Sequence, residues 1–113
     1  MTLDSRFDRL DRRDLPGGLT ILVAGNRRSR MLGLSKLDEL PDDHAMLFER
    51  CRSVHTGGMR FALDLLWIDK QGAVVRLDRD IAPRRLKTCL RARAVIEVNA
   101  GHGQRFADAL AAA

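Results

Sequence analysis

Residues 51–69 (CRSVHTGGMRFALDLLWID) hold the side chains whose types and spacing could do chemistry. Asp64 interrupts the apolar run of residues 63–68, and His55 and Arg60 precede it. If residues 59–68 form an extended strand, Arg60 and Asp64 point to the same face, because side chains alternate along a strand. An aspartate within an apolar strand needs a partner, which Arg60 or His55 would supply.

These three residues admit a functional and a structural interpretation. In the functional one, they form a polar pocket with Glu97 and Asn99, and the pocket holds a small polar ligand or a protein. In the structural one, they form a buried polar network that fixes the register of the strands, since structural ion pairs resemble functional sites closely.

Metal binding and catalysis are poorly supported by the residue spacing. Cys51 and His55 form one C-x-x-x-H pair, but the second closely spaced pair of a zinc site is absent. Cys51 or Ser53 lies near His55, yet no nucleophile-elbow pattern surrounds either residue. A phosphate-binding P-loop order is absent as well. We therefore expect no metal and no cofactor, and we assign no catalytic residue.

A basic segment gives the second candidate surface. Residues 79–93 contain six basic residues and one acid, which equals the whole net charge of +5. Its candidate contacts to a polyanion are Arg84, Arg85, Lys87, Arg91 and Arg93. No aromatic residue falls in this segment, so nucleic acid would be bound through phosphates and in a salt-sensitive manner. The alternative is a solvated arginine-rich face.

Size and composition indicate one ordinary globular domain. The chain has 113 residues, of which 45% are hydrophobic and 31% charged, enough to bury a core without metal or disulfide staples. It has no apolar run of membrane-spanning length and no signal-peptide pattern, so we expect a cytoplasmic protein. The two cysteines, Cys51 and Cys89, are then expected to be reduced thiols.

The hydrophobic pattern predicts a β-rich fold. Residues 19–24, 46–48, 63–68 and 73–77 read as short strands, with 63–68 buried on both faces and paired in a hairpin with 73–77. Residues 91–100 (RARAVIEVNA) alternate as a further strand. A short helix is expected before Pro16, another from Asn26 to about Leu32, and a weak one in 104–113.

These elements predict a mostly β or α+β chain, a small single-domain sandwich or partly closed barrel with one or two short helices. Residues 1–18 would form an N-terminal helix or tail with a turn, 19–101 the β-rich domain, and 102–113 a helical tail.

At these strands the chain resembles the domain of unknown function 192 (DUF192) family. The matching segments are 30–34 (RMLGL), 45–48 (AMLF), 53–56 (SVHT), 59–61 (MRF), 63–64 (LD), 66–69 (LWID) and 95–101 (VIEVNAG), with Gly72, Val74 and Pro83 between them. The resemblance spans about residues 19–101 and implies a compact, mostly β domain without an assigned activity. The chain departs from the family's pattern at Ala62 and Leu63, and after Gly101, where an alanine-rich tail stands in place of the family's closing strand.

The sequence thus favours a ligand-binding or protein-binding accessory module. Polyanion binding through residues 79–93 is the alternative. An enzyme that uses His55 and an acidic residue is the third and weakest hypothesis.

Overall fold

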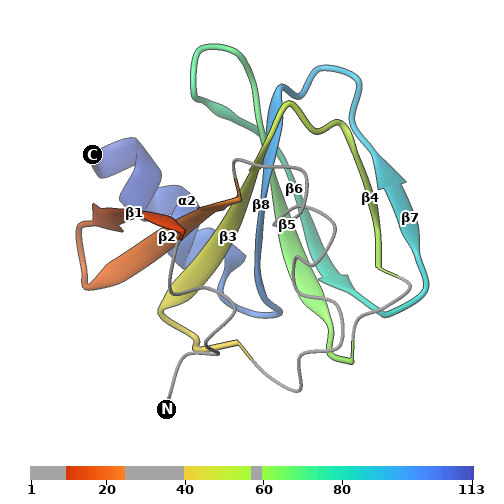
Figure 1. The fold of residues 1–113 in the computed structure, drawn as a ribbon, viewed down its shortest axis with the longest axis horizontal. Helices are drawn as coiled ribbons and strands as arrows, with labels where there is room; N and C mark the ends of the chain where they lie inside the picture. The colour runs from red at the N-terminus through yellow and green to blue at the C-terminus, as the bar shows by residue number, and fades with distance from the viewer. Residues whose placement is uncertain (1–9, 25–39, 57–59) are drawn as a thin grey trace.

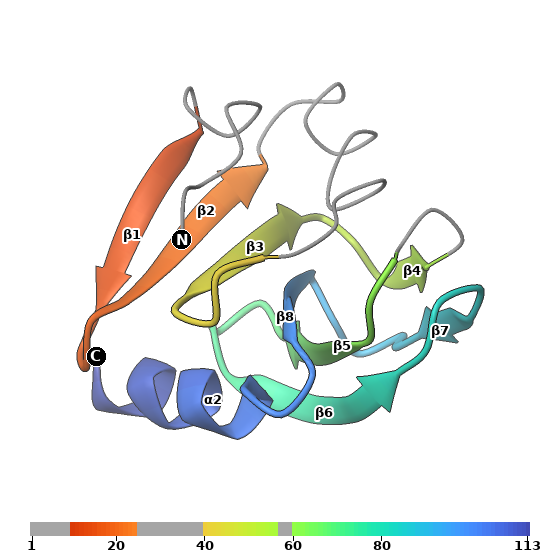
Figure 2. The same cartoon turned by 90° about the horizontal axis from the view of Figure 1, so that it is seen from below.

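A six-stranded sheet forms the middle of the molecule, with a helix on one side and a two-stranded ribbon on the other (Figures 1 and 2). The structure is a computed structural model that describes residues 10–24, 40–56 and 60–113. The elements are β1 (Asp11–Leu15), β2 (Leu19–Ala24), β3 (His44–Glu49), β4 (Ser53–His55), β5 (Leu63–Ile68), β6 (Val74–Ile81), β7 (Leu86–Thr88), β8 (Ala94–Asn99) and the helix α2 (Gly103–Ala112).

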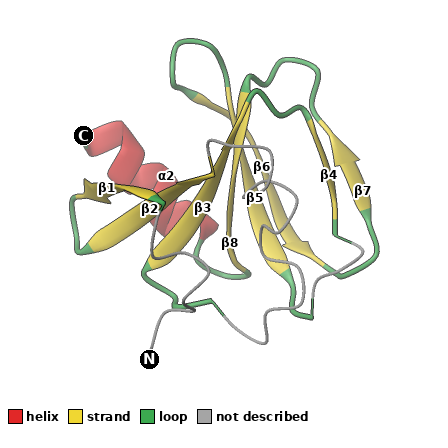
Figure 3. Ribbon diagram, viewed as in Figure 1, coloured by secondary structure: helices red, strands yellow, loops and turns green. Residues whose placement is uncertain are grey.

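The strand order of the large sheet is β1-β2-β3-β8-β5-β6, and β4 pairs with β7 in the ribbon. β2 and β3 run parallel, whereas the other pairs of the large sheet are antiparallel. β8 therefore lies between β3 and β5, although it is the last of these strands in the sequence (Figure 3).

Both faces of the sheet are covered at its centre. On one face Phe106 and Ala109 of α2 pack against the strands, and on the other Val54 of β4 and Cys89 cover them. Burial of a side chain as large as Phe106 contributes about 2–3 kcal/mol to folding. Every residue of β5 is buried, because this central strand is covered on both sides.

The structure confirms the predicted fold class, which is mostly β with a short C-terminal helix, and the sheets are not closed into a barrel. The predicted burial of residues 63–68 and the hairpin that follows them are also confirmed. Residues after Gly101 form α2 rather than a strand. In the part of the chain that the structure describes, no helix is long and apolar enough to cross a membrane.

The prediction of a helix leading up to Pro16 is wrong for residues 11–15. These residues form β1, which pairs antiparallel with β2. Gly17 and Gly18 adopt φ angles of 86° and 76°, a region that favours glycine, and so the chain can turn back into β2. The earlier part of that helix and the helix predicted at 26–32 lie outside the described residues.

Candidate binding surfaces

Asp64 is a buried carboxylate that accepts hydrogen bonds from the backbone of three other segments. Its side chain lies on the α2 face of β5 and is 1% exposed. Oδ1 accepts from the N–H of Asp80 at 2.8 Å, and Oδ2 accepts from the N–H groups of Gly101 at 3.1 Å and Gly103 at 2.8 Å. These contacts join β6, the turn after β8 and the first residue of α2, where a negative charge is also favoured by the helix dipole.

A β-bulge creates this arrangement. Leu63 pairs with Ile81 and Leu65 with Asp78, so Asp64 faces two residues of β6. Asp80 takes a φ of 54° in the bulge, and its N–H points at the Asp64 carboxylate. Asp64 therefore holds the bulge and the helix start together.

Glu97 and Asn99 lie on the opposite face of the sheet from Asp64. In the β5–β8 ladder, Asp64 pairs with Val98 and Leu65 with Glu97, and successive side chains point to opposite faces. Glu97 is 6% exposed, and this burial raises its pKa to about 8. The carboxyl is thus largely protonated at neutral pH.

Asn99 ties β8 to the segment before β3. Its Nδ2 donates to the carbonyl of Leu40 and to Oδ1 of Asp42, the latter at 2.7 Å. Its Oδ1 is buried and has no hydrogen-bond partner among residues 10–24, 40–56 and 60–113. Buried acceptors in folded proteins nearly always receive a hydrogen bond. Oδ1 could therefore accept one from a donor group of a ligand.

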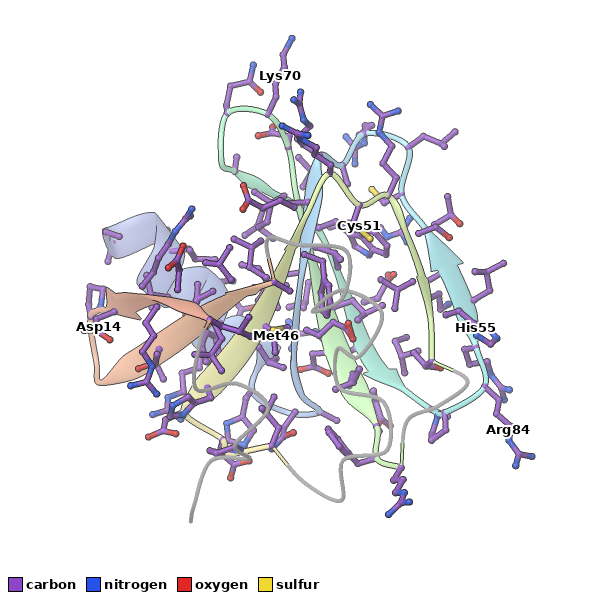
Figure 4. The ribbon with its side chains drawn as sticks, in the orientation of Figure 1. Asp14, Met46, Cys51, His55, Lys70 and Arg84 are labelled. Carbon is purple, nitrogen blue, oxygen red and sulfur yellow. The ribbon has the colours of Figure 1, made fainter. Side chains whose placement is uncertain are left out.

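The predicted cluster of five polar residues is therefore wrong in its geometry. β5 begins at Leu63, so the exposed Arg60 precedes the strand and the alternation argument does not reach it. His55 lies exposed on the ribbon, which covers the face opposite Asp64 (Figure 4). The sheet separates Asp64 from Glu97 and Asn99. Ligand binding by these residues stays a prediction.

The predicted polyanion surface is spread along the ribbon. Arg84 and Arg85 precede β7, while Arg91 and Arg93 follow it. Lys70 lines the same cavity as Arg91 and Arg93, and Figure 4 shows Arg84 at the opposite end of the molecule from Lys70. Lys87 is half-buried within β7 and lowers the pKa of Asp78 through its charge, a smaller cause than Asp78's burial and hydrogen bonds. The five basic residues thus do not form one continuous patch.

Two other loops bring further basic residues to Arg91 and Arg93. Two adjoining surface cavities of about 400 and 300 Å³ share Arg52 and Arg93. We call them the arginine groove, and its basic lining residues are Arg50, Arg52, Lys70, Arg91 and Arg93. Among the described residues of its lining the one acid is Asp69, which already accepts hydrogen bonds at Oδ1 from the N–H groups of Gln71 and Ala73.

Hydrogen bonds hold the loops of the arginine groove in place. The N–H of Arg93 donates to the carbonyl of Ile68 at 2.6 Å, and the carbonyl of Arg93 accepts from Cys51 at 3.0 Å. The Arg52 guanidinium donates through Nε to the carbonyl of Ala92 at 2.9 Å. Arg50, Arg52 and Lys70 were missed by the sequence analysis, because only the pairing of the strands shows that their loops meet.

Metal binding finds no support in the described part of the chain. Across residues 10–24, 40–56 and 60–113, no group of three or more histidine, cysteine, aspartate or glutamate residues is placed to hold a metal ion. Cys51 and Cys89 are free thiols.

Comparisons with known proteins identify relatives but no activity. The DUF192 family model, described as "Uncharacterized ACR", matches residues 11–107. A crystal structure from Sinorhizobium meliloti 1021, described as "a putative transcription regulator", is 26% identical, with a TM-score of 0.68 over 78% of this chain and 74% of that chain. A protein of unknown function from Novosphingobium aromaticivorans DSM 12444 is 17% identical, with a TM-score of 0.67 over 93% of this chain and 92% of that chain. No curated protein matches the chain.

Proposed function

Because the chain belongs to the DUF192 family, whose description assigns no activity, we propose a binding function in which the arginine groove holds a phosphate-bearing ligand. The observation that carries this proposal is the convergence of five basic side chains on two cavities that share Arg52 and Arg93. Guanidinium groups match the geometry of phosphate oxygens and bind them through paired hydrogen bonds.

The backbone contacts of the groove support the same function. Arg93 is held by Ile68 and Cys51, and the Arg52 side chain is oriented by the carbonyl of Ala92. A charged group held in advance loses less entropy when a ligand binds. Cavities of this size suit a small ligand or a short stretch of a longer one.

The phosphate can come from a small molecule or from a nucleic-acid backbone. The description of the Sinorhizobium meliloti relative as "a putative transcription regulator" favours nucleic acid as the source. The described residues of the lining include no aromatic side chain, so base stacking by them would add little, and the binding would weaken steeply with salt.

The test is an amide chemical-shift titration of the isotope-labelled protein with inorganic phosphate, adenosine monophosphate and a short single-stranded oligonucleotide. Each titration is run at low salt and at about 0.15 M salt, where the Debye length is about 8 Å. We expect saturable shifts at Arg52, Arg91 and Arg93. A higher affinity for the mononucleotide than for the oligonucleotide would identify a small molecule as the source of the phosphate. A higher affinity for the oligonucleotide would identify nucleic acid.

A matched pair of charge-reversal variants locates the binding. R91E/R93E changes two groove residues, and R84E/R85E changes two exposed arginines on the other side of β7. We expect the first variant to lose binding and the second to keep it, with similar melting temperatures. Equal losses of affinity in both variants would show that the ligand is attracted by the overall positive charge, and would contradict binding in the arginine groove.

Glu97 and Asn99 support a second candidate, the binding of a small polar ligand. The specific observation is the buried Asn99 Oδ1, which has no partner among the residues that the structure describes and lies two residues from the buried Glu97 carboxyl on the same sheet face. A ligand with N–H donors would satisfy these acceptors. A shift titration with guanidinium and methylammonium ions tests it: saturable shifts at Asn99 that N99L abolishes are expected, and unchanged shifts in N99L would contradict it.

A further inference from the structure

β7 is the outer strand of the two-stranded ribbon. In the described chain its one strand neighbour is β4, and no other element lies beyond it in either view (Figures 1 and 2). The outer edge of β7 is therefore open with respect to every described strand and helix. An open strand edge is a template for pairing with another chain.

The pairing with β4 shows which backbone groups face outward. Within the ribbon, the carbonyl of Arg85 accepts from the N–H of Thr56 at 2.8 Å, and the N–H of Cys89 donates to the carbonyl of Arg52 at 2.9 Å. Backbone groups alternate between the two edges of an antiparallel strand. The N–H and C=O groups of the residues between, Leu86 and Thr88, consequently point away from β4.

The side chains along this edge combine apolar and basic character. Leu86 is 66% exposed and Leu90 is 78% exposed, and they are the exposed large hydrophobic residues within the described ranges 10–24, 40–56 and 60–113. Alternation puts Leu86 on the outer face of the ribbon, whereas Arg85 and Lys87 belong to the inner face. An incoming strand would meet leucine on one face and positive charge on the other.

Thr56 holds the beginning of this edge in a fixed position. Its side chain is 1% exposed; Oγ1 donates to the carbonyl of Ala82 at 2.9 Å and accepts from the N–H of Arg85 at 2.8 Å. Its carbonyl accepts from the N–H of Arg84 at 3.0 Å. Because the edge is already ordered, a binding strand need not order it.

We infer that the open edge of β7 binds an extended segment of a partner protein in which apolar and acidic residues alternate. Such a segment would add a third strand to the ribbon through the outward backbone groups of Leu86 and Thr88. Its apolar side chains would lie beside Leu86, and its acidic ones beside Arg85 and Lys87. This surface is separate from the arginine groove and does not depend on the function proposed for it.

Charge argues against a second copy of this chain as the occupant. If two β7 edges paired antiparallel, Arg84 and Arg85 of one copy would approach Arg91 of the other. Like charges placed opposite each other across a ladder are destabilising. An acidic partner avoids this repulsion.

The probe is a capped seven-residue peptide of alternating glutamate and valine, added to the labelled protein. We expect saturable amide shifts in β7 and at least tenfold slower hydrogen exchange at the amides of Leu86 and Thr88. Two control peptides are used. One has lysine in place of glutamate and tests the need for negative charge. The other has the same composition, with valines and glutamates in separate blocks, and tests the need for alternation. Both should bind at least tenfold more weakly.

The variant T88P removes one outward N–H and no backbone bond to β4, at a position where an edge strand tolerates proline. It also removes the exposed contact of the Thr88 hydroxyl with Ser53 Oγ at 3.1 Å. We expect at least a tenfold loss of peptide affinity. L86S/L90S provides a second variant that leaves the backbone intact, with a smaller loss expected. Equal binding of the block peptide, or unchanged binding in both variants, would overturn the inference. So would sedimentation that shows a dimer of this chain broken by T88P, since the edge would then serve a second copy.

Discussion

Asp64 and Glu97 are two buried carboxyl groups on neighbouring strands, and the fold treats them in opposite ways. Asp64 lies on the α2 face and receives three backbone N–H donors. Glu97 lies on the other face, one position along the ladder, where burial raises its pKa to about 8. One site supplies donors to a carboxylate, and the other favours a protonated acid.

The difference shows what determines the role of an acid in a sheet. A carboxylate that receives hydrogen bonds can be a structural joint, because the donors replace the water it has lost. A buried carboxyl without such donors stays protonated, because its ionised form is unfavourable there. A rise in pH or a bound ligand can then change its protonation state. The four predictions that follow test this comparison, from the largest effect to the smallest.

Replacing Asp64 should have the largest effect. D64A leaves the N–H groups of Asp80, Gly101 and Gly103 without their acceptor, and we expect a loss of about 3–5 kcal/mol in the free energy of unfolding. Urea denaturation followed by tryptophan fluorescence measures it. D64N, which keeps one acceptor oxygen, should lose less. A stability within about 1 kcal/mol of wild type for D64A would contradict the structural role.

Glu97→Gln should stabilise the protein in a pH-dependent manner. The pKa of Glu97 rises from 4.5 to about 8 on folding, so the folded state holds a proton that the unfolded state releases above about pH 4.5. The unfolding free energy of wild type should therefore fall as pH rises from about 4.5 to about 8, and the fall should be absent in E97Q.

The expected difference between E97Q and wild type is near zero at pH 4 and about 3 kcal/mol in favour of E97Q at pH 7. Thermal melts across this pH range measure it. E49Q, a change at an exposed glutamate of β3, is the matched control and should follow wild type. Parallel pH profiles for E97Q and wild type would show that Glu97 is ionised in the folded state.

Gly103→Ala should crowd the Asp64 site without removing its carboxylate. A Cβ at this position would lie 2.7 Å from Leu77 Cδ1 and 2.8 Å from both Cβ and Oδ2 of Asp64. We expect a loss of about 2 kcal/mol, as overpacking usually costs. Q104A, at the next and exposed position of α2, should change stability little. The same small effect in both variants would show that the site can relax.

Asp78→Asn should have the smallest effect. Asp78 is partly buried, which alone would raise its pKa, but hydrogen bonds from Arg76 at 2.8 Å and Trp67 at 3.0 Å lower it below 3.8. A lowered pKa stabilises the fold above about pH 4 and loses this effect as the pH falls. We expect D78N to lose about 1 kcal/mol at pH 7 and less at pH 3. If the difference in stability between wild type and D78N instead grew as the pH fell, the pKa of Asp78 would not be lowered in the folded state.

The sequence predicted the elements that local patterns determine. The apolar run of residues 63–68, the hairpin after it and the alternation in residues 94–99 all follow from side-chain periodicity, and the structure has these strands. The sequence indicated that Asp64 needs partners, but the expected ones, Arg60 or His55, are not the donors that the structure gives it. The donors are backbone groups of Asp80, Gly101 and Gly103, and a backbone N–H leaves no signal in the sequence.

Two errors have the same physical origin. Residues 11–15 were predicted to be helical from local spacing, but pairing with β2 decided their conformation. The basic segment was treated as one surface because its residues are close in sequence, whereas an extended ribbon carries Arg84 and Arg91 apart. Arg50 and Arg52 approach Arg93 only after β3 and β8 have paired. Such contacts depend on the tertiary fold and not on local propensity.

The place of β8 in the sheet has a consequence for the order in which the chain can mature on the ribosome. Five strands of the large sheet are synthesised before β8, yet β3 and β5 touch each other only through it. Until β8 emerges, the nascent chain holds two separate half-sheets, each with an unpaired apolar edge that is prone to aggregation. Arrival of residues 94–99 joins the halves in one step, so chaperones that shield strand edges would matter most just before β8 emerges.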